Sequence, residues 1–171
     1  GYLAPTSFWK TKLIEVLYQE KFKLGKIWVS FHPKGHVLGS AQVRVEGNKE
    51  VWVVSGDYKR NADPTCQAFE EVPCDVFISE ATFAMPIYHW NEGKQVVEEL
   101  YKWWSSEPHH PSILFCYAFG KAQRVLAELS KFTDRPVYVH GAIESLMPVF
   151  RKQDITFIEN HPVSSMEHNH D

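Results

Sequence analysis

The sequence has few cysteines, no long apolar run and no excess of basic charge. Its three cysteines, Cys66, Cys74 and Cys116, lack CxxC spacing, so we expect a reducing, cytoplasmic location and no disulfide scaffold. No apolar run reaches the ~18 residues of a transmembrane helix, so we expect no membrane partner. Lys and Arg number 18 against 21 Asp and Glu, which excludes a module that binds nucleic acid by charge alone. A phosphate-bearing ligand must therefore be held by a few placed groups or by metal.

The composition is that of a folded protein of modest size. The 171 residues are 44% hydrophobic and 23% charged, which indicates one domain or two small ones. The chain begins Gly-Tyr-Leu-Ala-Pro, without the charged start and apolar region of a signal peptide. Because it also lacks an initiator methionine, we expect a fragment or a processed product.

The first half is predicted to be rich in strands. Val43 and Val45 alternate with polar residues, the period-two pattern of a half-buried strand. Gly47-Asn48 is a hairpin turn signal. The elements expected here are a helix from about residue 7 to Tyr18 and strands over 27–31, 41–46, 51–54 and 75–79.

The second half alternates strands with helices. Apolar residues at helical spacing predict helices over 94–104, 121–132 and 142–151, the last with Pro148 inside it. Buried strands are expected over 112–118 and 136–139, and a polar, frayed tail from about Asn160. This alternation indicates an α/β layer with parallel strands, so the overall fold class expected is α/β (α+β).

Three acidic or imidazole side chains follow predicted strands. His36 lies in a loop between Gly35 and Gly39, Asp57 follows Gly56, and Glu80 ends the strand over 75–79. Loops at one edge of a sheet can direct several side chains at one point. His and carboxylate ligands suit zinc or manganese. The alternative, left open by spacing alone, is a loop histidine, a turn aspartate and a capping glutamate.

Several ordered motifs carry a family resemblance. The stretches 35–41 (GHVLGSA), 55–58 (SGDY) and 79–83 (SEATF) resemble motifs of metallo-β-lactamase-fold nucleases of the β-CASP group. The similarity is strongest to bacterial ligase-associated DNA exonucleases, also described as messenger-RNA 3′-end-processing-factor-like exonucleases. The stretches 86–88 (PIY), 117–126 (YAFGKAQRVL) and 138–144 (YVHGAIE) extend the resemblance over roughly residues 25–155.

The resemblance implies roles for the three polar residues. His36 corresponds to a metal-binding histidine, Asp57 to the aspartate that bridges two metal ions, and Glu80 to an acid that orients a histidine near the leaving group. Ala81 replaces the serine usual in that motif. The family's His-x-His-x-Asp-His motif and its later histidine motifs are absent. The chain therefore resembles a central piece of a longer enzyme, and it is expected to bind metal weakly or not at all.

The resemblance also implies an architecture and an activity. Residues 1–88 would form part of the lactamase αββα sandwich, 89–160 a β-CASP-like α/β cap, and 161–171 a polar tail. The intact enzyme would hydrolyse phosphodiester bonds in DNA or RNA with two zinc or manganese ions. The specific expectation is a DNA-repair exonuclease that works with a DNA ligase and a DEXH helicase, the piece itself being inactive.

Two further positions are candidates for substrate contact. Gly120, Lys121 and Arg124 follow a predicted strand and open a helix, where an anion is favoured. His140 follows the next strand, with a capping role as the alternative. His32 precedes a proline, so we expect it at the surface or beside a ligand rather than as a ligand itself.

Two other functions stay open at this point. One is a catalytically silent relative that serves as a binding or scaffold subunit. The other is a lactamase-fold hydrolase of small esters or thioesters, against which the inserted α/β piece argues. No Ser–His–Asp or Cys–His arrangement stands out along the sequence.

Overall fold

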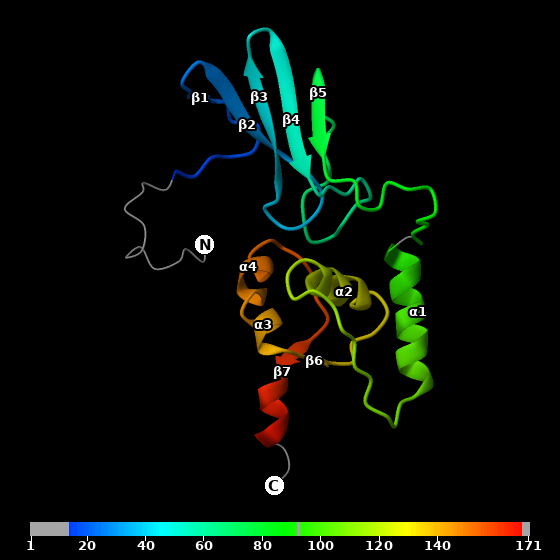
Figure 1. The fold of residues 1–171 in the computed structure, drawn as a ribbon. Coiled ribbons are helices and arrows are strands. Elements are labelled where there is room, and N and C mark those ends of the chain that lie inside the picture. The colour runs from blue at the N-terminus through cyan, green and yellow to red at the C-terminus, as the bar shows by residue number, and fades with distance from the viewer. Residues whose placement is uncertain (1–13, 92, 169–171) are drawn as a thin grey trace. The chain divides into compact units, whose positions relative to one another are not determined.

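The structure is a computed structural model that describes residues 14–91 and 93–168. The chain divides into two compact units, Gly1–Thr82 and Phe83–Asp171. The first unit contains a sheet and the second is built mainly of helices (Figure 1). Each unit is described by itself.

The first unit is a five-stranded sheet in the order β1-β2-β3-β4-β5 (Figure 1). Strands β1 to β4 are antiparallel neighbours, and β5 pairs with β4 in parallel. The predicted strands over 27–31, 41–46, 51–54 and 75–79 are thus confirmed, each within a residue or two at its ends. The bounds are β1 Phe22–Leu24, β2 Ile27–Pro33, β3 Ala41–Gly47, β4 Glu50–Gly56 and β5 Val76–Ser79.

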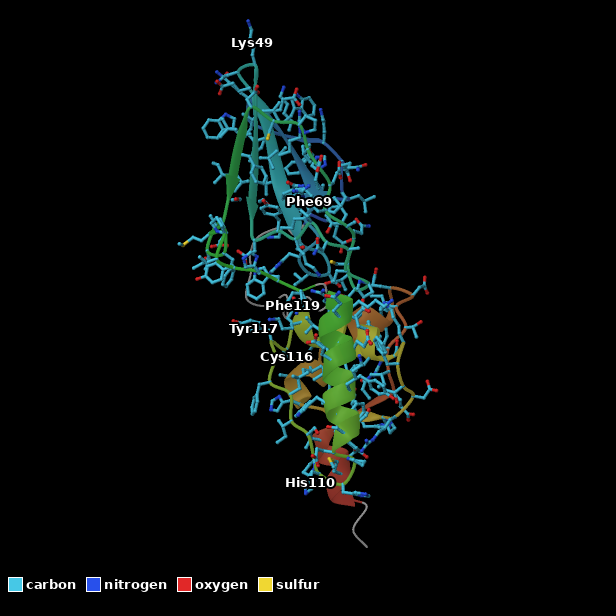
Figure 2. All side chains as sticks on the ribbon, turned by 90° about the vertical axis from the view of Figure 1, so that its right-hand side faces the viewer. Lys49, Phe69, His110, Cys116, Tyr117 and Phe119 are labelled. Carbon is cyan, nitrogen blue, oxygen red and sulfur yellow. The ribbon has the colours of Figure 1, made fainter. Side chains whose placement is uncertain are left out.

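The β3–β4 connection is a tight hairpin. Its two central residues, Asn48 and Lys49, both have positive φ, 52° and 68°. A two-residue turn with both φ values positive matches the twist of the flanking strands. The turn is therefore centred one residue later than the Gly47-Asn48 signal indicates. Lys49 lies at the tip of the hairpin (Figure 2).

The two faces of the sheet differ in chemistry. Residues that are paired across neighbouring strands point to the same face. One face carries apolar residues, and several of them are well exposed: Leu24 (63%), Trp52 (42%), Val54 (41%) and Ile78 (44%). The other face carries the buried residues Ser30, His32, Gln42, Val53 and Ser55. The polar face is therefore covered and the apolar face is partly open.

The segment between β4 and β5 contributes to the cover of the polar face. The Gln42 side-chain amide donates to the Glu70 carbonyl at 2.6 Å and to the Pro33 carbonyl at 3.1 Å. Thr65 in the same segment is 1% exposed and is held by Asp63, whose carboxylate accepts from the Thr65 hydroxyl and amide. Hydrogen bonds therefore fasten this segment, together with the contact between the Tyr58 and Phe69 rings, whose centroids are 5.1 Å apart.

The second unit arranges helices around a short parallel strand pair, β6–β7 (Figure 1). The predicted helix over 94–104 and the strand over 136–139 are confirmed, and the helix predicted over 121–132 ends earlier. The bounds are α1 Gly93–Ser106, α2 Lys121–Leu129, β6 Val137–Val139, α3 Gly141–Glu144, α4 Met147–Arg151, β7 Asn160–Pro162 and the 3-10 helix η1 Val163–His168.

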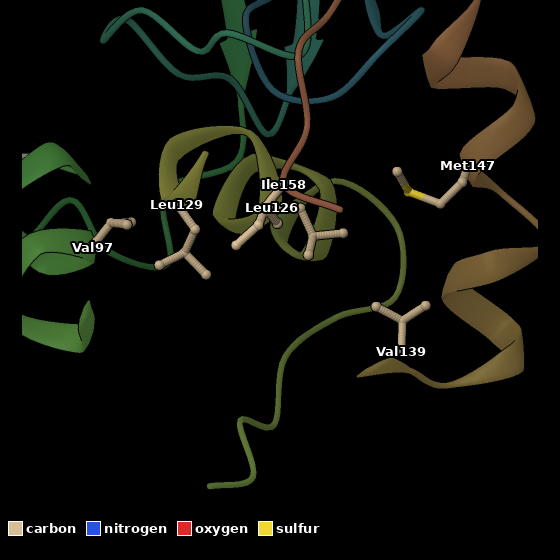
Figure 3. Packing of buried hydrophobic residues seen from close by; sticks show 6 residues of the cluster. All are labelled: Val97, Leu126, Leu129, Val139, Met147 and Ile158. Atoms are coloured by element: carbon tan, nitrogen blue, oxygen red, sulfur yellow. The ribbon is translucent and has the colours of Figure 1, made fainter. Parts of the chain in front are cut away.

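One apolar core holds the second unit together. Its buried members come from α1, α2, β6, α4 and the approach to β7: Val97, Leu126, Leu129, Val139, Met147 and Ile158 (Figure 3). The Ile158 amide donates to the Leu126 carbonyl at 3.2 Å, which ties the C-terminal segment to α2. Burying several large apolar side chains is the main stabilising contribution in such a unit.

The sequence prediction was wrong for residues 112–118. No strand forms there, and Ile113, Phe115 and Tyr117 are 72%, 91% and 77% exposed. Figure 2 labels Cys116 and Tyr117 on this stretch and Phe119 directly after it. A strand needs a neighbour to satisfy its backbone groups, and β6 pairs only with β7 in the described part of the chain.

Three other predictions also differ from the structure. The helix predicted over 142–151 is two short helices, α3 and α4, with Pro148 in the first turn of α4, where its missing N–H costs nothing. Residues 160–168 form β7 and η1 rather than a frayed tail. The helix expected from about residue 7 is not helical over 14–17, and its earlier part lies outside the described residues.

The architecture is a mixed α/β fold, as the sequence predicts: a five-stranded sheet followed by a unit of helices and a two-stranded sheet. None of the helices described is both long and apolar enough to span a membrane.

Candidate functional site

The ends of strands β2 and β4 bring His36 and Asp57 close together. His36 lies in the loop after β2, and Asp57 directly follows β4. The His36 Nε2 atom lies 3.8 Å from the Asp57 Oδ2 atom, and both side chains are substantially exposed, by 41% and 60%. Two donor groups predicted from the sequence to share a site are therefore neighbours at one end of the sheet.

Two glycines shape the backbone around this pair. Gly56 has a φ of +60° and lies at the irregularity in the β4–β5 register, which re-aims the chain just before Asp57. Gly35 has a φ of +69°, and a β-carbon there would collide with the Lys59 carbonyl. The Lys59 amide donates to the Lys34 carbonyl at 3.0 Å, which holds the two loop backbones close together at this point. Only glycine fits at Gly35 without moving the backbone.

The backbone of Glu80, but not its carboxylate, contacts this end of β4. Its amide donates to the Gly56 carbonyl at 3.5 Å. Its side chain turns to its own loop, where the Oε1 atom accepts from the Thr82 amide at 2.5 Å and from the Thr82 hydroxyl. These hydrogen bonds from Thr82 hold the pKa of the Glu80 carboxyl below its ordinary value. The structure therefore gives Glu80 a turn-capping contact, the alternative left open by the sequence.

The donor set for a metal is incomplete. Within 14–91 and 93–166, no three His, Cys, Asp or Glu side chains are grouped so that they could hold a metal ion. Two ligands of one zinc ion at about 2.1 Å and the tetrahedral angle lie about 3.4 Å apart, close to the His36–Asp57 separation. The pair suits two positions around one cation. By itself the pair does not complete a two-metal centre, whose ions need about four ligands each.

Lys34 is a neighbour of the site that the sequence prediction missed. Its ammonium donates to the Ser55 carbonyl at 3.1 Å, and it lies 3.8 Å from where a β-carbon on Gly56 would be. Lys34 follows β2 directly and precedes His36 by two residues, and this position in the sequence could have indicated that it lies near the site. It brings a positive charge to the strand end that carries Asp57.

His32 is buried, so of the two expected positions, at the surface or beside a ligand, the first is wrong. It is 8% exposed; its Nδ1 lies 2.9 Å from Glu70 Oε1 and its Nε2 2.9 Å from Ser30 Oγ. This Ser–His–Glu order resembles a hydrolase triad, yet Ser30 is 1% exposed, so no substrate reaches its oxygen. The network joins the sheet to the segment between β4 and β5. The signal in the sequence was the i, i+2 spacing of Ser30 and His32 on one strand face.

The pKa of Glu70 reflects this network. Desolvation raises it, but hydrogen bonds from Gln19 and His32 outweigh that effect, so the pKa of the Glu70 carboxyl lies below its ordinary value. The Gln19 side-chain amide donates to Glu70 Oε2 at 3.0 Å. Glu70 is therefore held as a carboxylate between two elements of the first unit.

In the second unit, the first turn of α2 carries Lys121 and Arg124. The Gly120 amide already donates to Gln123 Oε1 at 2.7 Å, and the Ala122 amide to the Tyr117 carbonyl at 3.1 Å. Two of the backbone donors expected to face a phosphate are thus paired within the protein. A phosphate contact here would rest on the Lys121 and Arg124 side chains.

His140 caps a helix. Its Nδ1 accepts from the Ala142 amide at 3.1 Å at the start of α3. Its ring is exposed, and α3 has only four residues. The capping contact is the alternative that the sequence left open for this residue.

Comparisons with known proteins find two distant relatives. Over 132 residues, the chain is 28% identical to a protein of Opitutus terrae named "Probable DNA ligase", a match that covers 75% of this chain. Over 140 residues, it is 26% identical to an "RNase J-like protein" of Methanocaldococcus jannaschii, covering 74% of this chain. These matches span only 13% and 32% of the relatives' own lengths. The chain matches none of the family models compared with it.

Proposed function

We propose that the chain is part of a nuclease that hydrolyses phosphodiester bonds in DNA or RNA. Both relatives carry names of nucleic-acid enzymes, and one name denotes a ribonuclease-like protein. Matches that cover 75% and 74% of one chain must overlap over about half of it, so one segment is shared with both. A nuclease segment accounts for both names, because it can stand alone or within a longer protein that also joins strands.

The ligase name by itself does not make this segment a ligase. Only 13% of that relative is matched, so its strand-joining part has ample room elsewhere. A nuclease that prepares DNA ends for a ligase agrees with this arrangement. We therefore propose a DNA-repair exonuclease working with a ligase as the specific form of this function, with RNA processing as the form that the second name favours. A helicase partner stays a prediction of the family resemblance.

The observation that carries the proposal is the proximity of His36 and Asp57. They come from two loops, yet their nitrogen and oxygen atoms lie 3.8 Å apart at one end of the sheet. We propose that they bind one divalent cation, zinc or manganese, as two of its ligands. The described residues do not complete the ligand set of even one ion. This chain by itself is therefore expected to be inactive.

The architecture implied by this function is also a proposal. The sheet of residues 1–88 would be part of the lactamase sandwich, and 89–160 the cap. The partly exposed apolar face of the sheet, with Trp52 and Val54, is what half of a sandwich would present. Lys121 and Arg124 would contact substrate phosphates, and His140 would contact the bound nucleic acid.

A silent scaffold is the second candidate. The observation that favours it is the absence, from the part of the chain that the structure describes, of a third metal-ligating side chain beside His36 and Asp57. Such a protein would hold nucleic acid without cutting it. Its Asp57 would then have no role in activity.

The test uses the protein in the longest form that its gene encodes. End-labelled single- and double-stranded DNA and RNA are incubated with it in manganese, with a chelator as the blank. We expect chelator-sensitive cleavage that falls by about 100-fold or more in Asp57→Asn, beyond the loss typical of residues that only support a ligand. Asp134→Asn, an exposed aspartate of the second unit, is the matched control.

Two outcomes would contradict the proposal. Absence of cleavage on every substrate would favour the scaffold. Cleavage that survives in Asp57→Asn would remove the metal role of this residue.

A further inference from the structure

Three aromatic side chains form an exposed cluster at the start of the second unit. Phe83, Tyr88 and Trp90, here called the ring cluster, are 56%, 42% and 72% exposed. Phe83 lies edge-on to Tyr88 and to Trp90, with centroids 5.2 Å and 5.4 Å away. The Tyr88 and Trp90 rings are nearly parallel, at 10° and 6.4 Å. Large aromatic rings are normally buried in a core, so three exposed ones in mutual contact need another explanation.

The loop that carries the ring cluster has a defined shape. The Tyr88 amide donates to the Met85 carbonyl at 3.1 Å, which turns the chain back and brings Tyr88 and Trp90 to Phe83. Each ring is thus oriented by its two neighbours, Phe83 edge-on to the other two and those two parallel to each other. The cluster therefore presents its rings in an arranged form.

A positively charged side chain lies against the residue that begins α1, shortly after the cluster in the chain. A β-carbon on Gly93 would collide with the Arg124 guanidinium, so this group rests against the start of α1. Gly93 follows Trp90 by three residues, no more than about 11 Å of chain. Lys121, one turn before Arg124 on α2, lies with its Nζ atom 5.4 Å from the centre of the exposed Tyr117 ring. Aromatic faces and cations thus occur together on this part of the second unit.

We propose that the ring cluster is a stacking platform for the bases of single-stranded nucleic acid, with Arg124 and Lys121 meeting its phosphates. Every base has a flat face, so stacking on aromatic rings binds strands without regard to sequence. A net charge of −3 leaves little affinity from charge alone, so a nucleic-acid ligand has to be held by contacts of another kind. Paired bases inside a duplex do not offer their faces, so the platform selects single strands.

This inference rests on the proposed function for the class of ligand, but its test involves no cleavage. Fluorescein-labelled oligo(dT) is titrated with the 171-residue chain in the presence of a chelator, and binding is read as fluorescence anisotropy. An abasic oligomer of the same length keeps the phosphates and removes the bases. A duplex of the same length keeps the bases but hides their faces.

The expected result separates the rings from the cations. Trp90→Ala weakens binding of oligo(dT) by about tenfold and leaves binding of the abasic oligomer unchanged, while Trp90→Phe keeps most of the affinity. Trp52→Ala, which removes a tryptophan exposed to 42% in the first unit, is the matched control and changes nothing. Lys121→Ala weakens binding of all three probes and lowers the salt dependence.

Several results would overturn the proposal. These are no binding of any probe, equal affinity for oligo(dT) and the abasic oligomer, or equal losses in Trp90→Ala and Trp52→Ala. A Trp90→Ala variant that alters only the sedimentation coefficient would make the cluster a contact between copies of the chain instead. If bases stack on the cluster but the gene-length protein cleaves no substrate, only the proposed nuclease function is refuted. If the gene-length protein cleaves nucleic acid but bases do not stack on the cluster, only the proposed stacking platform is refuted.

Discussion

The interiors of the two units are built from different kinds of side chain. Among the described residues, the buried apolar side chains of the first unit are Val29 and Val53, whereas nine such side chains lie in the second unit. The buried polar side chains show the opposite division: five lie in the first unit and two in the second. The fully buried interior of the first unit is thus mainly polar, with hydrogen bonds between the sheet and its covering segment, and that of the second is mainly apolar.

Because of this difference, we expect side-chain substitutions to lower the stability of the two units in different ways. Apolar packing loses free energy in proportion to the volume removed, whereas a polar network loses most when one member leaves its partners unpaired. The first unit also leaves one sheet face partly exposed, with Trp52 and Val54 at its surface. Its stability is therefore expected to depend on what covers that face, and the second unit's on its own core.

The largest effect is expected from Phe150→Ala in the second unit. Phe150 is 1% exposed and packs edge-on against Phe119 at 6.0 Å. Removing its ring leaves a cavity, which should lower the free energy of unfolding by about 3–5 kcal/mol. Urea denaturation followed by circular dichroism at the helix band measures it. Phe115→Ala, at a site 91% exposed, is the matched control and should change little; similar losses in both would refute the assigned core.

A smaller loss is expected from Gln42→Ala in the first unit. The Gln42 amide donates to the carbonyls of Pro33 and Glu70, and its removal leaves both without this donor. The expected cost is about 1–3 kcal/mol. Hydrogen exchange of the β2 and β3 amides measures it, with the exposed Gln67→Ala as control. A loss as large as that of Phe150→Ala would erase the contrast between the units.

A pH-dependent effect of moderate size is expected at Asp63. Burial raises its pKa, but hydrogen bonds from Lys59 and Thr65 outweigh this and hold the pKa of the carboxyl below its ordinary value. A carboxylate with a lowered folded-state pKa stabilises the protein above the ordinary aspartate pKa, and the contribution disappears as pH falls through the folded-state value.

Asp63→Asn should therefore be less stable than the parent protein near neutral pH, with the difference shrinking in acid. Unfolding free energies from urea titrations at a series of pH values check this, with Asp134→Asn as a control. A difference that stays constant with pH would show that Asp63 acts without its charge.

The smallest effect is expected from Ser55→Ala. The Ser55 hydroxyl is buried and has no hydrogen-bond partner in the described structure. Replacing it should change stability by no more than about 0.5 kcal/mol, or raise it, since an unpaired polar group is costly to bury. Ser30→Ala, whose hydroxyl contacts His32, is the comparison and should cost about 1 kcal/mol. A large loss in Ser55→Ala would reveal a bonded partner for this oxygen.

Local patterns were sufficient wherever an element's own residues decide its structure. The alternation of Val43 and Val45 and the helical spacing of Val97 and Tyr101 correctly predicted β3 and α1. The proximity of His36 and Asp57 also followed from strand ends meeting at one edge. Element ends were less accurate, as the later centre of the β3–β4 turn shows.

Two of the failures depend on partners distant in the sequence. Residues 112–118 have the composition of a buried strand, yet no neighbouring strand receives them in the described structure. His32 was expected at the surface or beside a ligand, because the sequence does not show that Glu70, 38 positions later, contacts it in the interior. The ring cluster was missed for a local reason: its three rings lie within eight residues, but they meet only because the loop turns back, and spacing alone does not predict that turn.

The amino-acid sequence was enough to predict the class of fold, most of the strands and helices, and the proximity of His36, after β2, to Asp57, after β4. These depend on side-chain periodicity and on short-range backbone preferences, which neighbouring residues control. Tertiary structure alone decided which side chains are buried, that His32 joins a polar network, and that Phe83, Tyr88 and Trp90 share one surface. The burial and the polar network depend on segments far apart in the chain coming into contact, which no local pattern encodes, whereas the ring cluster depends on the conformation of the loop over 83–90.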